Sequence, residues 1–89
     1  MHQMTLRITP AGSGPSATLK VDGRLTSEEV AELRLACDRV EGRLILDLSG
    51  LQSADRQGVS VLQELRTKGA ELIGASPYLQ ILLDRASSD

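Results

Sequence analysis

Few residues of this sequence could carry out chemistry. His2 is the only histidine and lies near the N-terminus, so we expect no Ser-His-Asp triad and no Cys-His pair. A metal site needs several converging Cys, His or carboxylate ligands, and the sequence offers no such spacing. Paired carboxylates are the remaining route to catalysis, but the acidic residues fall mostly on predicted helix surfaces, where solvation is ordinary. We therefore predict a protein that is not an enzyme, with no catalytic, metal or cofactor site.

Gly12-Ser13-Gly14 suggests a phosphate-binding loop at first sight. A phosphate loop continues into Lys-Ser/Thr and opens a helix, and neither feature follows here. We interpret the segment as a turn.

One segment combines a helix start with an exposed charge. Ser53-Ala54-Asp55-Arg56-Gln57-Gly58 leads from an apolar stretch into a predicted helix. The carboxylate of Asp55 can cap that helix, and Gly58 allows close backbone packing. Arg56 and Gln57 are either solvated residues of the first turn or the edge of a docking surface, and both interpretations stay open at this point.

Composition narrows the possible partners. The 89 residues are 40% hydrophobic and 25% charged, which is ordinary for one globular domain. Tyr78 is the only aromatic residue, and the lysines and arginines are scattered on a chain of net charge -2. Stacking on nucleic acid and a basic membrane-binding surface are therefore not expected. Cys37 has no disulfide partner, and it lies among apolar helix positions where we expect it to be buried.

The same sequence predicts a cytoplasmic location. The N-terminal residues lack the apolar stretch of a signal peptide, and the apolar runs are far too short to cross a bilayer. Direct membrane insertion is not expected.

The periodicity of apolar residues predicts the elements that position this segment. Strict alternation over 4–9 and 17–22 predicts two strands in an antiparallel hairpin. Thr26 with Glu29 forms a capping box before an amphipathic helix of about four turns. The apolar run 43–48 is typical of a central strand covered on both faces.

The second half of the chain repeats the alternation of strand and helix. Residues 51–55 lead into a second helix, which ends at Gly69, and 70–73 forms a short strand. Ser76 and Pro77 then begin a last helix as its cap and first residue.

The predicted fold is one α/β domain over residues 1–89, in the order β-β-α-β-α-β-α, with 1–3 and 86–89 fraying. We expect a four-stranded, mostly parallel mixed sheet packed with helices, because helices join its consecutive strands. The predicted core consists of Leu6, Leu19, Val21, Val30, Leu33, Leu44, Leu46, Leu48, Val59, Leu62, Leu72 and Leu82.

The central region resembles a known motif. The segment 46–51, Leu-Asp-Leu-Ser-Gly-Leu, is followed by Asp55-Arg56-Gln57-Gly58-Val59 and Leu62, and this order resembles the core motif of STAS domains, the family of bacterial anti-sigma-factor antagonists. In that family an Asp-Leu pair ends a strand, and Asp-Ser-Ser/Thr-Gly opens a helix. Val21-Asp22-Gly23-Arg24-Leu25 is similar to the family's Gly-x-Leu turn. Gly69, the strand after it and Ser76-Pro77 also match, so the resemblance covers nearly the whole chain.

The resemblance implies a protein that docks onto another protein. In the antagonists the partner is an ATP-binding anti-sigma kinase, which phosphorylates the first serine of the motif. Here Arg56 occupies that phosphoacceptor position, and Gln57 occupies the next hydroxyl position. Ser53 stands where the family commonly has a bulky apolar residue. We therefore expect a STAS-like binding module without this phosphorylation switch, whose docking loop comprises Ser53, Asp55, Arg56, Gln57 and Gly58.

Two alternatives stay open. STAS domains also serve as accessory subunits of ABC-type ATPases in lipid or solute transport, and some are reported to bind nucleotides. The sequence does not indicate the oligomeric state, the pathway or the identity of the partner.

Overall fold

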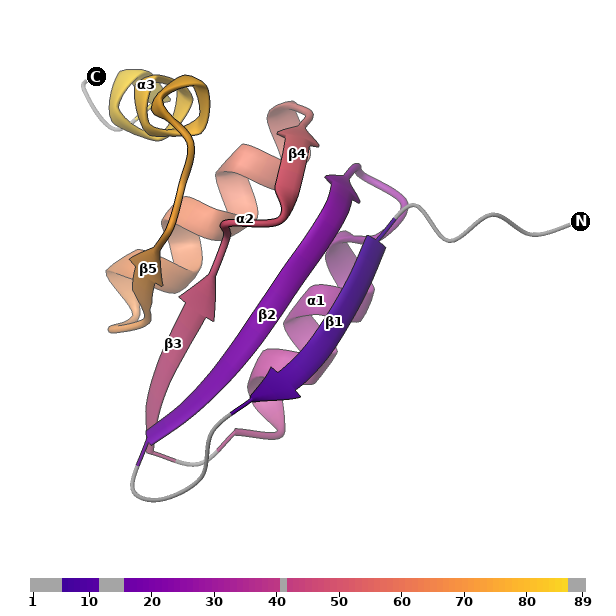
Figure 1. Ribbon diagram of the computed structural model, residues 1–89, viewed down its shortest axis with the longest axis vertical. Helices are drawn as coiled ribbons and strands as arrows, with labels where there is room; N and C mark the ends of the chain where they lie inside the picture. Colours follow the sequence, from indigo (N-terminus) through magenta and orange to yellow (C-terminus); the bar gives the residue numbers. More distant parts are fainter. Residues whose placement is uncertain (1–5, 12–15, 41, 87–89) are drawn as a thin grey trace, which may run out of the picture.

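The computed structural model describes residues 6–11, 16–40 and 42–86. Its elements, in chain order, are β1 (Leu6–Ala11), β2 (Ser16–Leu25), α1 (Val30–Asp38), β3 (Arg43–Asp47), β4 (Leu51–Ala54), α2 (Arg56–Thr67), β5 (Glu71–Ile73) and α3 (Pro77–Ala86), as Figure 1 shows. The predicted α/β class and order of elements are confirmed, with β4 as one addition. The expected fraying of residues 1–3 and 87–89 and the turn at Gly12–Gly14 lie outside the described residues, and Ala86 is the last residue of α3.

The sheet is mixed and mostly parallel, as predicted, but it has five strands. Its order is β1-β2-β3-β5, with β1 antiparallel to β2, and β2 and β5 parallel to β3. β2 is ten residues long, so it pairs with β3 along its first half and with β4 along its second half. Between β3 and β4 the chain makes a turn, closed by the Leu51 N–H on the Leu48 carbonyl at 3.0 Å. The residues after this turn form β4, which pairs with β2. The sequence had indicated only a connecting segment at this place.

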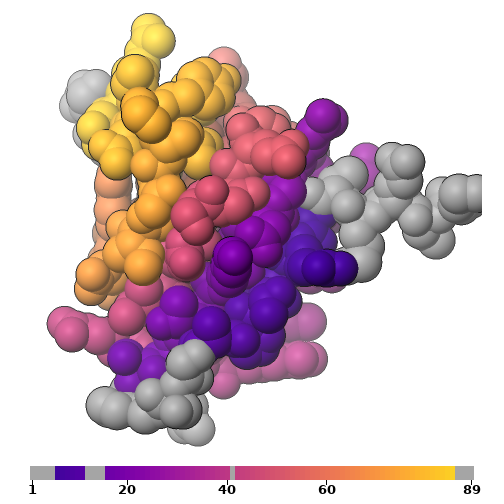
Figure 2. Space-filling view, viewed as in Figure 1, coloured from indigo at the N-terminus to yellow at the C-terminus, as the bar shows by residue number. Residues whose placement is uncertain are grey.

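Helices α1 and α2 lie on the same face of the sheet (Figure 1). Both belong to crossovers that move in the same direction, from β2 to β3 and from β4 towards β5. Crossovers between parallel strands are right-handed, so both helices fall on one side. In the part of the chain that the structure describes, no helix lies over the other face of β1 and β2, whose side chains reach the surface in Figure 2.

The prediction that strand 43–48 is covered on both faces is therefore wrong. Leu46 is fully buried beneath the helices, whereas Ile45 and Asp47, on either side of it in the strand, are only partly buried. The alternation of side chains along a strand places these two on the uncovered face. There Asp47 lies across from Lys20 in the register of β2 and β3.

The core is built almost entirely from leucine and valine. Every predicted core residue is buried or packs against the core, with Val30, Leu44, Leu72 and Leu82 partly buried at its margin. Buried hydrophobic residues beyond the predicted set are Leu25, Cys37, Leu51, Val61, Leu65, Leu79 and Leu83. Cys37 is therefore buried as expected. Leu79 and Leu83 bring α3 into the same core.

Helix α1 is shorter than predicted. It spans nine residues, about two and a half turns, and begins at Val30 because residues 27–29 form a separate turn. The Thr26 hydroxyl donates to the Glu29 carboxylate at 2.7 Å and does not cap a backbone N–H, so the predicted capping box does not form. At α3, in contrast, the Leu79 N–H donates to Ser76 Oγ at 3.2 Å, as the sequence predicted.

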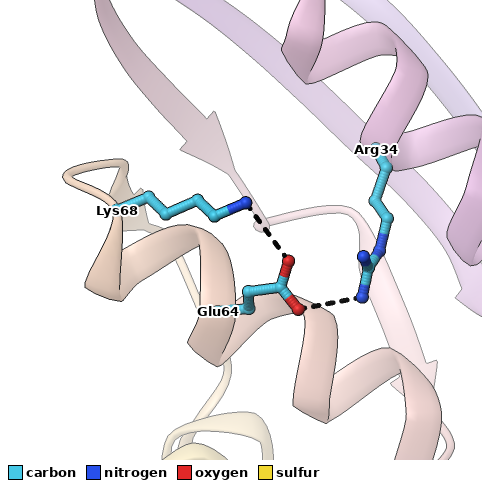
Figure 3. Close-up of polar contacts among 3 residues, drawn as sticks. All are labelled: Arg34, Glu64 and Lys68. Carbon is cyan, nitrogen blue, oxygen red and sulfur yellow. Dashed lines mark hydrogen bonds and ion pairs between the residues drawn. The ribbon is translucent and has the colours of Figure 1, made fainter.

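A polar contact links the two helices on the covered face. Glu64 of α2 accepts from Arg34 of α1 at 2.9 Å and pairs with Lys68, one turn later, at 3.4 Å (Figure 3). All three side chains are more than a third exposed, so each pair contributes less than about 1 kcal/mol. The packing of Leu33 and Leu62 in the core holds α1 and α2 in place.

Candidate docking site

Asp55 fixes the start of α2. It is the N-cap residue, and its Oδ1 accepts from the Gly58 N–H at 2.8 Å. Its Oδ2 accepts from the Ser27 N–H at 2.8 Å, and its own N–H donates to the Leu25 carbonyl at 3.0 Å. One residue therefore ties the first turn of α2 to the end of β2 and to the turn before α1. The predicted cap is confirmed, and this role of Asp55 is structural.

Gly58 brings the first turn of α2 into direct contact with β2. A Cβ atom at this position would lie 2.4 Å from the Leu25 carbonyl oxygen and 2.9 Å from Leu25 Cγ. Both separations are shorter than any van der Waals contact, so only glycine fits without a shift of the helix. The close packing predicted for Gly58 is present.

Arg56 and Gln57 occupy the first turn of α2 and are exposed. Neither has an ion pair or hydrogen bond to another side chain within the described ranges. Ser53 lies in β4, paired with Arg24 of β2, and is half-buried. The predicted docking loop is thus not a loop, because it consists of the end of a strand, a cap and the first helical turn. Arg56 and Gln57, the two residues that depart from the motif, lie in the first turn of a helix.

A groove runs between α2 and α3 beside this turn. Its volume is about 840 Å³, and its lining residues are Ala54, Asp55, Arg56, Val59, Ser60, Gln63, Tyr78, Leu82 and Arg85. Tyr78, in the first turn of α3, is 58% exposed. Sequence reasoning missed the contribution of α3 to this surface. The one available signal was an aromatic residue in the first turn of a helix whose other large apolar residues are aliphatic.

A hydrogen bond and contacts in the core join the two helices that line the groove. The side-chain amide of Gln63 on α2 donates a hydrogen bond to the Leu83 carbonyl on α3. Leu79 and Leu83, on the inner side of α3, are buried in the common core. The packing of α2 on α3 therefore sets the position of the two helices that line the groove.

Burial, together with the neighbouring Asp38 carboxylate, raises the pKa of the Cys37 thiol to about 11. No group of three or more His, Cys, Asp or Glu residues in the described ranges could hold a metal ion. Among the same residues, no helix is long and apolar enough to cross a membrane.

Comparison with known proteins supports a fold assignment. No family model matches the sequence, and no curated protein is significantly similar to it. Among solved structures, the chain is similar to the crystal structure of an antisigma-factor antagonist, a STAS domain from Rhodobacter sphaeroides, with a TM-score of 0.63 and 26% sequence identity. The match covers 82% of this chain and 94% of that one. The chain therefore has a STAS-like fold, and the similarity supports a regulatory, protein-binding module.

Proposed function

We propose that this protein is a non-catalytic regulatory module that binds a partner protein through the first turn of α2, without a phosphorylation switch at that turn. The observation that carries the proposal is the exposed Arg56-Gln57 pair, presented on a rigid helix start in a STAS-like fold. Asp55 and Gly58 hold the turn in place, and Arg56 and Gln57 contact the partner.

Electrostatics favour an acidic partner surface. The free N–H groups at a helix N-terminus carry partial positive charge, and the guanidinium of Arg56 adds a full charge in the same place. Arginine also forms two parallel hydrogen bonds with a carboxylate, which makes it a frequent energetic centre of interfaces. The guanidinium of Arg56 is exposed here although the chain has a net charge of -2.

Two classes of partner fit the proposal. One is an ATP-binding anti-sigma kinase in a bacterial signalling pathway that regulates transcription. The other is the ATPase of an ABC-type transporter, to which this protein would be an accessory subunit in the cytoplasm. Capture of the tagged protein from its native host, followed by identification of the bound protein, distinguishes them. A third possibility, a small nucleotide-binding domain, would instead show direct binding of a labelled nucleotide to the purified protein.

The test of the surface is a charge reversal. Arg56→Glu should weaken binding of the purified partner by more than about 1 kcal/mol, or roughly fivefold in Kd, and leave the melting temperature nearly unchanged. Arg39→Glu, an exposed reversal at the end of α1, is the matched control and should bind as the wild type does. If Arg56→Glu binds normally while Glu32→Arg on α1 abolishes binding, the partner contacts a different face and the proposal is wrong.

A further inference from the structure

A second groove lies at the β1 edge of the sheet, between β1 and α1. In the described sheet β1 is an edge strand paired with β2, and α1 lies behind these two strands in Figure 1. The groove has a volume of about 560 Å³, and its lining includes Ile8 and Pro10 of β1 and Leu35 and Ala36 of α1. Leu35 is 55% exposed although it borders this apolar surface. The apolar face of β1 is therefore only partly covered by α1.

Two charged residues lie on the α1 side of this groove. Glu32 and Arg39 are the charged residues in its described lining, and both are exposed. Neither has an ion pair or hydrogen bond to another side chain within the described ranges. Arg34, in contrast, pairs with Glu64 of α2 and is not part of the lining. The side of α1 towards β1 thus carries an anion near its start, a cation at its end and Leu35 between them.

The positions of these residues are symmetric about one point of the helix. Arg39 is the C-cap residue and keeps helical backbone angles, so the helical face continues to it. Residues at spacings of three, four and seven share that face: Glu32, Leu35, Ala36 and Arg39. The midpoint between Leu35 and Ala36 is also the midpoint between Glu32 and Arg39, which lie about 10 Å apart along the axis.

A two-fold axis through that midpoint, perpendicular to the helix, places an identical helix antiparallel to the first. Glu32 then lies opposite Arg39 of the second copy, and Leu35 lies opposite Ala36 of the second copy. Because each contact of a two-fold interface occurs twice, one register gives two ion pairs and two contacts of a large side chain on a small one.

We propose that this face of α1 binds a second copy of the chain, with the two α1 helices antiparallel across a two-fold axis. Leu35 of each copy lies over Ala36 of the other and covers the apolar groove, and Glu32 pairs with Arg39 at both ends. Each of the two charges also suits the dipole of its own helix, but the dipole gives no reason for an exposed Leu35 between them. The first turn of α2 takes no part in this contact, so the dimer is separate from the proposed docking site.

The size of the contact indicates a weak dimer. Two turns of one helix and part of one strand on each copy form a face at the low end of the roughly 1,200–2,000 Å² that specific interfaces bury in total. We therefore expect a Kd of roughly 10–100 μM and a monomer in dilute solution.

Sedimentation velocity of the full chain, from low micromolar to near-millimolar concentration, measures the dimer. Glu32→Arg and Arg39→Glu each place like charges at both symmetric contacts and should raise the Kd of the dimer about tenfold or more. An equimolar mixture of the two variants restores both ion pairs and should form a mixed dimer with about the wild-type Kd. The double variant that combines Glu32→Arg with Arg39→Glu should form a dimer by itself for the same reason.

Leu35→Asp tests the apolar centre of the contact. It should abolish the dimer over the measured range, because it places a charge where Leu35 meets Ala36 of the second copy. Ile81→Asp, the same kind of change at a residue that is 56% exposed on α3, is the control and should form the dimer as the wild type does. Circular dichroism checks that each variant is folded. Arg56→Glu should keep the wild-type dimer while it weakens binding of the partner, which separates this inference from the proposed function.

Three results would overturn the inference. One is a wild-type chain that stays monomeric up to near-millimolar concentration. Another is a dimer that survives Leu35→Asp and both charge reversals, or that Arg56→Glu alone dissociates, because the second copy then binds a different face. The third is a mixture of Glu32→Arg and Arg39→Glu that forms no dimer, because the antiparallel register then does not hold.

Discussion

Asp55 Oδ2 lies 2.8 Å from the backbone nitrogen of Ser27, a residue 28 positions earlier in the chain. The other oxygen of the same carboxylate accepts from Gly58 within the first turn of α2. The Asp55 carboxylate therefore helps to fix the position of Arg56 and Gln57 relative to the rest of the fold. In this protein the residue that orients the candidate docking surface is distinct from the residues proposed to contact the partner.

Asp55→Ala should lower the free energy of unfolding by about 1–2 kcal/mol, because two backbone N–H groups lose their acceptor at a helix N-cap. Asp55→Asn should cost less, since its amide oxygen can still accept one of the two hydrogen bonds. Urea denaturation followed by circular dichroism measures both. Gln57→Ala, an exposed change in the same turn, is the control, and an equal loss in that variant would show that the cap is not the cause.

Gly58→Ala should destabilise the protein by about 1–3 kcal/mol, the usual cost of forcing an extra carbon into a packed site. The added methyl group would meet the Leu25 carbonyl oxygen at 2.4 Å, so the start of α2 must move away from β2. Amide hydrogen exchange should then be faster at Asp55, whose N–H donates to that carbonyl. Ser60→Ala, exposed on the next turn, should stay within about 0.5 kcal/mol of wild type. A wild-type melting temperature for Gly58→Ala would contradict the close packing described here.

Leu46→Ala should cost about 2–5 kcal/mol, because Leu46 is fully buried in the middle of the sheet and its truncation leaves a cavity. Leu35→Ala removes the same atoms from a side chain that is 55% exposed and should change stability little. Chemical denaturation of both variants gives the comparison. Similar losses in the two would place Leu46 outside the core.

Cys37 should react slowly with iodoacetamide in the folded protein. With a pKa of about 11, roughly one thiol in a thousand is ionised at pH 8, and the side chain is also buried. The thiol keeps its proton more tightly in the folded state than in the unfolded state, so the contribution of Cys37 to stability should be constant below about pH 9 and should fall from there towards pH 11. In Cys37→Ala, the part of this decline in stability that is due to the thiol should be absent. Alkylation as fast as in urea-unfolded protein would contradict the prediction.

No phosphate should be found in the first turn of α2. By the resemblance to anti-sigma-factor antagonists, the phosphoacceptor position holds Arg56, which has no hydroxyl group for a serine kinase to phosphorylate and whose positive charge does not mimic a phosphate. Intact-mass and peptide mass spectrometry of protein from native cells is the measurement. Stoichiometric phosphate on Ser53 or Ser60 would show that a switch operates elsewhere on this surface, and the proposed lack of phosphoregulation would then be wrong.

Local patterns in the sequence were sufficient to predict the order of elements and the cap of α2. The apolar period distinguishes strands from helices within a few residues, and the cap contact of Asp55 with Gly58 spans only three positions. Ser76 behaves in the same way at the start of α3. The STAS-like fold was also predictable, because the motif residues around Asp55 and Gly58 occur in the required order.

Only the tertiary structure decided how these elements face one another. β4 has only four residues, which is too few for a clear alternation of apolar and polar residues, and it pairs with the second half of β2. One face of the sheet carries no helix because the two crossovers run in the same direction. The groove depends on α3 packing against α2, which brings Tyr78 and Arg56 into the lining of one groove. The sequence by itself determined what is set by contacts within one or two turns of chain. The contacts between distant elements depend on leucines from strands and helices packing into one core. A pattern within a few neighbouring residues carries no information on which distant element each leucine contacts.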